Sequence, residues 1–148
     1  MMEINEKFYA DGLFIREPRG KYDVQKDFTS LEAWSKACDV KRFFYQQIIP
    51  LLPEVEKNNL ANQIRRAAVS VTANIAEGYG RFHFREGIQF YRISRGSLYE
   101  LKDHLISCHD FGYINIELKE EGLRLIEQSK MKIGGFINFV KNQIQSTK

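Results

Sequence analysis

Apolar residues recur along most of this chain at the spacing of amphipathic helices. In the first run, residues 31–52, they lie three or four positions apart. That period places them on one side of a helix, facing a core. We expect the helix to begin at a capping box in which Thr29 is the N-cap and Glu32 reaches back to it. Pro50 and Pro53 should end it, because proline lacks a backbone donor and clashes with the preceding turn.

The same spacing predicts three further helices. The second starts within 54–59 and ends at Gly78-Tyr79-Gly80, the third covers about 84–111, and the fourth about 116–145. Gly134-Gly135 lies in the middle of the fourth helix, where each glycine costs about 1 kcal/mol against alanine. We therefore expect a close backbone approach or a bend at this pair.

No segment alternates with period two over a useful length, so we expect no sheet. Four amphipathic helices with short connections predict an all-α fold, an antiparallel up-down-up-down four-helix bundle over residues 28–148. Residues 1–27 show no lasting helical period. We interpret them as an irregular N-terminal extension with a short strand-like piece at 13–16. The length of 148 residues suits a single bundle domain.

The end of the first helix carries more apolar residues than one core-facing stripe needs. These residues are Phe43, Phe44, Tyr45, Ile48, Ile49, Leu51 and Leu52. They cannot all face one bundle core if the segment is a regular helix. Surplus apolar surface on a small bundle usually marks an interface. This pattern predicts that the protein is an oligomer.

Composition and motif spacing exclude several classes of function. A chain that is 43% hydrophobic and 28% charged is typical of a soluble globular protein, and no signal peptide or membrane-length apolar run is visible. We therefore expect a cytoplasmic protein. Cys38 and Cys108 fit no CxxC spacing and are interpreted as reduced, buried residues.

No catalytic, metal-binding or cofactor-binding constellation is recognisable. His104 and His109 are five residues apart and do not share a helix face as an i, i+4 metal pair would. There is no P-loop, and no pair of Glu-x-x-His motifs for a di-iron site. We expect no metal, no cofactor and no enzymatic activity.

Arginine is concentrated in the middle of the chain. Six arginines and no lysine lie between residues 62 and 95, opposed there only by Glu77 and Glu86. On the third helix, the stripe Arg85, Ile88, Arg92, Arg95, Tyr99 and Lys102 predicts an exposed or interfacial basic face. Guanidinium groups suit bidentate contacts with phosphate. The candidate nucleic-acid-binding residues are Arg65, Arg66, Arg81, Arg85, Arg92, Arg95 and Lys102.

The arginines have a second interpretation that the sequence leaves open. They could pair with acids within or between subunits, namely Glu100, Asp103, Glu117, Glu120, Glu121 and Glu127. Asn74 and Glu77, at the end of the second helix, likewise could contact a ligand or belong to a helix-end network. For these two we favour the network, with Glu77 paired to Arg81 at i, i+4.

Two blocks of sequence resemble a known family. The first, Q-x-R-R-A-A-x-S-x-x-x-N-I-A-E-G-x-x-R, is met from Gln63 to Arg81, and the second, R-G-S-x-x-E-L, from Arg95 to Leu101. These blocks resemble the four-helix-bundle proteins encoded in intervening sequences of bacterial large-subunit ribosomal RNA genes. That family is similar in fold to the accessory variability determinant (Avd) proteins of diversity-generating retroelements. Residues 1–27 depart from its pattern, in which little precedes the first helix.

The resemblance implies a ring-like homopentamer of four-helix bundles without enzymatic activity. For the Avd branch it also implies binding to a reverse transcriptase and to nucleic acid, RNA or DNA, through a basic surface. The motif positions assigned to structure are Asn74, Glu77, Gly78, Gly96, Ser97 and Glu100. Two functions stay open: an oligomeric nucleic-acid-binding accessory protein, possible partner of a reverse transcriptase, or a structural oligomer whose arginines contact subunits or a protein partner.

Overall fold

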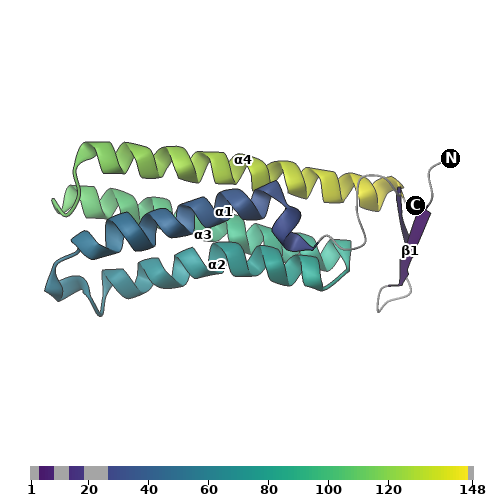
Figure 1. Cartoon of the computed structure of the whole chain (residues 1–148), viewed down its shortest axis with the longest axis horizontal. Helices are drawn as coiled ribbons and strands as arrows, with labels where there is room; N and C mark the ends of the chain where they lie inside the picture. The colour runs from purple at the N-terminus through teal and green to yellow at the C-terminus, as the bar shows by residue number, and fades with distance from the viewer. Residues whose placement is uncertain (1–3, 9–13, 19–26, 147–148) are drawn as a thin grey trace.

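The computed structural model of the protein describes residues 4–8, 14–18 and 27–146. Its main body is a four-helix bundle, in which the four long helices lie side by side (Figure 1). They are α1 (Glu32–Phe43), α2 (Leu60–Gly80), α3 (Phe84–Asp110) and α4 (Ile116–Ser146). The predicted bounds of the second, third and fourth helices agree with these to within a few residues. None of the described helices has an apolar stretch long enough to span a membrane.

The start of the first helix differs from the predicted capping box. Thr29 lies inside a 3-10 turn, η1 (Phe28–Ser30), and the N-cap is Asp27, whose carboxylate accepts the Thr29 N–H at 2.9 Å. Hydrogen bonds from the Thr29 hydroxyl and N–H lower the pKa of Asp27. The α-helix then begins at Glu32 behind Leu31, which provides no side-chain cap. The prediction failed because an aspartate two residues upstream competes for the same backbone donor.

The first helix changes its winding after Phe43. A π turn, η2 (Phe44–Ile48), and a 3-10 turn, η3 (Ile49–Leu51), replace the regular helix that was expected. Phe43, Phe44 and Ile48 lie in the core, where each is at most 4% exposed. Tyr45 and Leu51 are 40% and 50% exposed, so the apolar residues of this segment do not all face the core, as the sequence predicted.

Polar side chains outside the helices define the other helix starts. The carboxylate of Glu56, in the 3-10 turn η4 (Glu54–Glu56), accepts the Leu60 N–H at 3.1 Å where α2 begins. His83 Nδ1 accepts the Glu86 N–H at 3.2 Å at the start of α3. Asn115 accepts the Leu118 N–H at 2.9 Å at the start of α4. Each satisfies a backbone donor that the first helical turn leaves without a partner.

Close helix packing depends on glycines other than the predicted pair. A Cβ built on Gly78 of α2 would lie 2.9 Å from the Gly87 carbonyl oxygen of α3, and one on Gly122 of α4 would lie 2.7 Å from Phe43. By contrast, a Cβ on Gly134 or Gly135 would meet nothing within 4 Å. The close approach expected at 134–135 is absent within the described part of this chain, and α4 continues as one helix through it.

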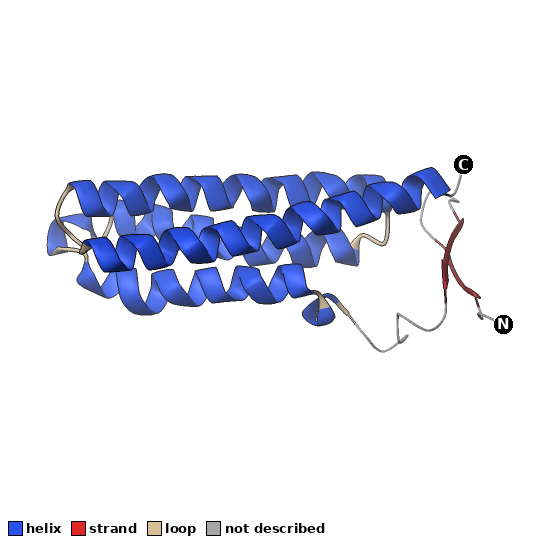
Figure 2. Ribbon diagram, turned by 90° about the horizontal axis from the view of Figure 1, so that it is seen from above, coloured by secondary structure: helices blue, strands red, loops and turns tan. Residues whose placement is uncertain are grey.

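The prediction of no sheet is wrong for the N-terminal extension. Strands β1 (Ile4–Phe8) and β2 (Phe14–Pro18) pair antiparallel, with Ile4 opposite Pro18 and Phe8 opposite Phe14. The strand-like piece expected at 13–16 overlaps β2, although Leu13 lies outside the described residues. The hairpin lies beyond the end of the bundle at which α4 finishes (Figure 2). Strands of five residues are too short for an alternation to stand out from the sequence.

Candidate nucleic-acid interface

Arg65 and Arg66, which are adjacent on α2, border a shallow depression on the outside of the bundle. It measures about 430 Å³ and is lined by Tyr45, Arg65, Arg66, Val69, Ser70 and Asn74. Arg65 is half-buried and its Nη1 donates to Asn62 Oδ1 at 3.1 Å, whereas Arg66 is exposed. Tyr45 comes from the π turn, so the depression joins the end of the first helix to the middle of α2.

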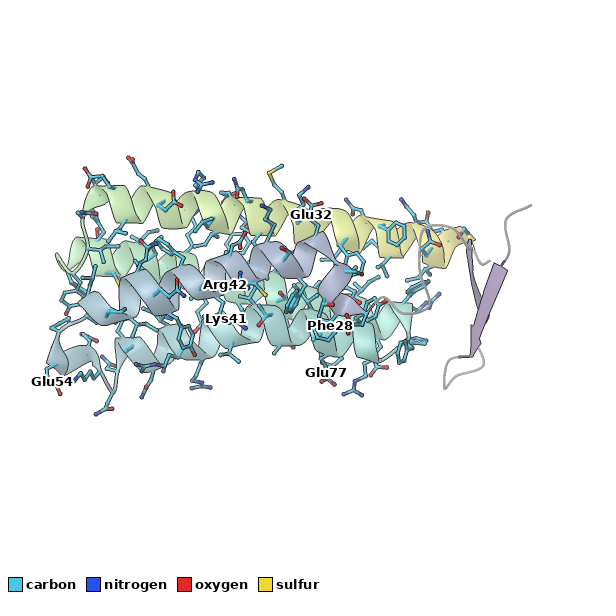
Figure 3. The ribbon with its side chains drawn as sticks, in the orientation of Figure 1. Phe28, Glu32, Lys41, Arg42, Glu54 and Glu77 are labelled. Atoms are coloured by element: carbon cyan, nitrogen blue, oxygen red, sulfur yellow. The ribbon has the colours of Figure 1, made fainter. Side chains whose placement is uncertain are left out.

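A lysine that the sequence did not single out lies one helical turn before Tyr45. Lys41 is in the last turn of α1, and its side chain extends toward α2 (Figure 3), where its Nζ donates to the Thr72 hydroxyl at 3.1 Å. Lys41 and Tyr45 were both missed as candidate site residues. Their spacing of four positions was the available signal, but it cannot show that α2 places its arginines opposite them.

The basic stripe predicted on α3 is present only in part. Arg85 and Arg92 are exposed, Arg95 is half-buried, and Tyr99, one turn after Arg95, is 53% exposed. Ile88 was expected on this face but is buried in the core at 6% exposure. A residue three positions from Arg85 lies about 60° away around the helix, and here that rotation turns it inward.

Lys102, the last basic member of the α3 stripe, is engaged by an acid. Its Nζ lies 3.8 Å from Glu127 of α4, and the same carboxylate accepts from Lys130 at 2.8 Å. Lys130 in turn sits 4.2 Å above the ring of Tyr99. Hydrogen bonding to Lys130 lowers the pKa of Glu127, which keeps the carboxylate ionised. Lys102 therefore belongs to an α3–α4 contact.

Arg81 is also fully engaged. Its guanidinium contacts Glu77 at 2.7 Å and Glu86 at 3.2 Å, and lies 5.2 Å from the ring centre of Phe90. The Glu77–Arg81 pair confirms the helix-end network predicted for Glu77. Figure 3 shows Glu77 pointing outward from α2. This network links the end of α2 to the start of α3 and leaves Arg81 little capacity for a phosphate.

The other arginines do not pair with acids of the described chain. Within residues 27–146, no ion pair joins Arg65, Arg66, Arg85, Arg92 or Arg95 to a carboxylate. Four of the six acids proposed as their partners contact other groups: Glu100 and Asp103 contact His104, Glu121 contacts Arg124, and Glu127 contacts two lysines. Pairing within one subunit therefore does not explain these five arginines.

The motif positions assigned to structure mostly lie between α2 and α3. Asn74 Nδ2 donates to the Ser70 carbonyl at 2.9 Å and to the Ser70 hydroxyl at 2.8 Å. Ser97 of α3 donates to the same hydroxyl at 2.7 Å. Gly78 is buried at the helix crossing, whereas Gly96 is exposed and Glu100 contacts only His104 among the described residues. These contacts connect the two sequence blocks.

The cysteines and histidines form no reactive or metal-binding cluster in the described part of the chain. Cys38 and Cys108 are both buried and free, as predicted. Burial raises the pKa of both thiols, that of Cys108 to about 11. The neutral thiol is therefore the form present near neutral pH at both positions.

A comparison with known families identifies the bundle. The family described as 23S rRNA-intervening sequence protein matches residues 29–135. The chain belongs to this family. The match includes every candidate arginine and both sequence blocks, and it begins after the β-hairpin. No curated protein matches the chain.

Proposed function

We propose that this protein is a non-enzymatic accessory protein that binds nucleic acid through arginines of α2 and α3. The observation that carries the proposal is the set of arginines without acidic partners: Arg65, Arg66, Arg85, Arg92 and Arg95. The other arginines of residues 27–146 are paired with acids: Arg42 with Asp39, Arg81 with Glu77, and Arg124 with Glu121. Unpaired guanidinium groups on a rigid surface suit a polyanion.

The α3 arginines have a spacing that matches extended contact with a phosphate backbone. Arg85 and Arg92 are seven residues apart, which is two turns and about 10 Å along a helix. Arg95 follows one turn later. Guanidinium groups at such intervals contact successive phosphates of a strand that runs along the helix, and each contact releases counterions.

The proposal includes an antiparallel up-down-up-down arrangement of the helices. It is supported by contacts in which residue numbers rise on one helix and fall on its neighbour. For α2 and α3 the pairs are Ser70–Ser97, Val71–Ser94 and Gly78–Gly87. For α3 and α4 they are Lys102–Glu127 and Tyr91–Phe136, and for α1 and α4 they are Glu32–Lys132 and Phe43–Gly122.

The protein is further proposed to assemble as a homopentameric ring. A ring needs two different surfaces on each subunit, one for each neighbour. Met131 on α4 is 72% exposed and Gly135, one turn later, leaves room for a close helix approach. Ile93 on α3 is 51% exposed. These exposed apolar side chains on two different helices support an assembly of copies, and the family resemblance suggests five.

A reverse transcriptase is the proposed protein partner if the chain acts as the similar Avd proteins do. The alternative function is a structural oligomer whose arginines contact neighbouring subunits. This alternative draws support from the same unpaired arginines, because an acid of another copy would satisfy them as well as a phosphate. Charge reversal distinguishes the two.

The test combines light scattering with an RNA titration at low salt. The double variant Arg92→Glu/Arg95→Glu is compared with Arg124→Glu, a reversal on α4 away from the proposed surface. Nucleic-acid binding predicts that the double variant keeps the wild-type oligomer mass but no longer gains mass when RNA is added. Arg124→Glu should keep the wild-type mass and still gain RNA mass. Dissociation of the oligomer by the double variant would assign the arginines to a subunit interface. A wild-type protein that ignores RNA and DNA would contradict the proposed function.

A further inference from the structure

The depression beside α2 combines an aromatic ring with unpaired cations. Tyr45 lines it with 40% of its surface exposed, and Val69 adds an apolar side chain that is 47% exposed. Arg65 and Arg66 border the same space. Its volume of about 430 Å³ falls within the roughly 300–1,000 Å³ typical of small-ligand sites. An exposed ring next to guanidinium groups is the combination that binds a nucleobase and its phosphate.

The charge around the depression is positive. Among the described residues, Lys41 bonds only to the Thr72 hydroxyl, Arg65 only to the Asn62 amide oxygen, and Arg66 forms no ion pair. Asp39, the acid nearest in sequence to Lys41, contacts Lys36 and Arg42 instead. The site therefore favours an anionic ligand over a cationic or neutral one.

The exposed tyrosine belongs to the π turn η2. Phe44 and Ile48, at the two ends of η2, are fully buried, and they fix the backbone that carries Tyr45. Their packing anchors the turn from which the Tyr45 side chain lines the depression. Single π turns inside helices are found frequently at functional sites. The backbone that carries the ring is thus anchored on both sides of Tyr45, so the turn itself need not become ordered on binding.

We infer that this depression binds one unpaired nucleotide of a single-stranded nucleic acid, with the base stacked on Tyr45 and the phosphate on Arg65 and Arg66. The inference rests on the proposed nucleic-acid binding and specifies its form. A duplex keeps its bases stacked inside, so it cannot offer a base face to the tyrosine. Duplexes would contact only the arginines. The depression therefore gives the protein a preference for single strands.

The experiment measures fluorescence anisotropy of a labelled 12-nucleotide oligouridine and of a labelled RNA duplex of equal length, at low salt. Tyr45→Ala should weaken binding of the single strand about tenfold, the typical cost of losing one stacking ring, and leave the duplex unchanged. Tyr45→Phe keeps the ring and should bind as the wild type does. Phe111→Ala removes an exposed aromatic ring at the C-terminal end of α3, outside the depression and away from the α3 arginines, and serves as the matched control.

A second variant keeps the test valid if Tyr45→Ala disturbs the fold. Arg66→Ala changes an exposed side chain of the depression and should weaken binding of the single strand. Binding of a 12-nucleotide oligothymidine should be weakened by both variants in the same way. Equal loss of single-strand and duplex binding with Tyr45→Ala, or no loss of single-strand binding with either variant, would overturn the inference. If Arg92→Glu/Arg95→Glu abolishes binding while Tyr45→Ala has no effect, only this inference fails. If the wild type binds none of the probes, the proposed function fails with it.

Discussion

The hydroxyl of Ser97 on α3 donates a hydrogen bond of 2.7 Å to the hydroxyl of Ser70 on α2. Asn74 holds the same acceptor from its own helix, at 2.8 Å. Ser70 and Asn74 belong to the first sequence block and Ser97 to the second, so the two blocks meet at one point between the helices. Ser97 is buried at 7% exposure, and its bond is therefore shielded from water. The serines and Asn74 contribute to the pairing of α2 with α3.

The Ser70–Ser97 contact predicts a measurable coupling. Ser97→Ala should lower the free energy of unfolding by about 1 kcal/mol, because a shielded hydrogen bond is lost. Urea denaturation of both single variants and the Ser70→Ala/Ser97→Ala double variant would give the coupling energy. Ser35→Ala, at an exposed position of α1, should change stability by less than about 0.5 kcal/mol. Additive effects of the two serine substitutions would show that the hydroxyls do not interact.

The helix crossing at Gly78 predicts a steric effect of a single methyl group. In Gly78→Ala the new Cβ would lie 2.7 Å from Tyr91 and 2.9 Å from the Gly87 carbonyl oxygen. Overpacking of this kind costs about 1–3 kcal/mol, which thermal unfolding would record. Gly80→Ala is the control, because its Cβ meets nothing within 4 Å. Equal stability of the two variants would mean that α2 and α3 separate easily at this end.

The α3 arginines predict a change in the salt dependence of RNA binding. Arg85→Ala and Arg92→Ala should each weaken binding at low salt and reduce the slope of log K against log salt by about 0.7 for a single strand, since each removes one phosphate contact. Lys102→Ala should leave the slope unchanged, because Glu127 already engages that side chain. Anisotropy titrations from about 50 to 200 mM salt cover the useful range. If the arginine variants leave the slope of log K against log salt unchanged, the phosphates of the RNA do not contact Arg85 or Arg92.

The buried Cys108 predicts a loss of stability at alkaline pH. Burial, reinforced by the charge of Glu56, raises the pKa of this thiol from 9.0 to about 11. Its contribution to stability is fully present below about pH 9 and is lost as the pH rises towards 11, because the unfolded thiol ionises first. The loss should be at most about 3 kcal/mol.

Urea denaturation at several pH values would measure this linkage. Cys108→Ala should be less stable overall, because it leaves a small cavity, but its stability should fall less steeply between pH 9 and 11 than that of the wild type. The tyrosines and lysines that ionise in the same range are common to both proteins and cancel in the comparison. Parallel pH profiles of the two proteins would exclude the thiol as the cause.

The sequence predicted the helices well because their apolar period persists over many turns. The bounds of α3 and α4 follow from such long stripes together with Gly112 and the Asn115 cap. The helix-end pair of Glu77 with Arg81 was also predictable, since i, i+4 neighbours on a helix are set by local geometry. Both cases need no knowledge of how one helix lies on another.

The predictions that failed depend on relations between elements. The π turn at 44–48 leaves no mark on composition, because it is stabilised by the burial of Phe44 and Ile48 against the other helices. Gly134-Gly135 looks like a close approach in sequence, but only the neighbouring helix decides which glycine is covered. For the same reason the six basic candidates other than Arg81 could not be divided by sequence into paired and unpaired side chains.

The π turn also links the number of residues in the first helical segment to the face that this segment presents to the bundle. A π turn holds one residue more than the α-helical turn it replaces. Deleting one of the exposed residues 45–47 would restore a regular helix while Glu32–Phe43 keep their faces toward the bundle, because the wide turn already accommodates the extra residue. Trp34 and Val40 would then keep their present neighbours, whereas a deletion of one residue between Val40 and Phe43 would rotate them away by about 100°. Alanine substitutions along this segment test side chains one at a time, whereas a deletion would test the register in which the whole helix packs against the bundle.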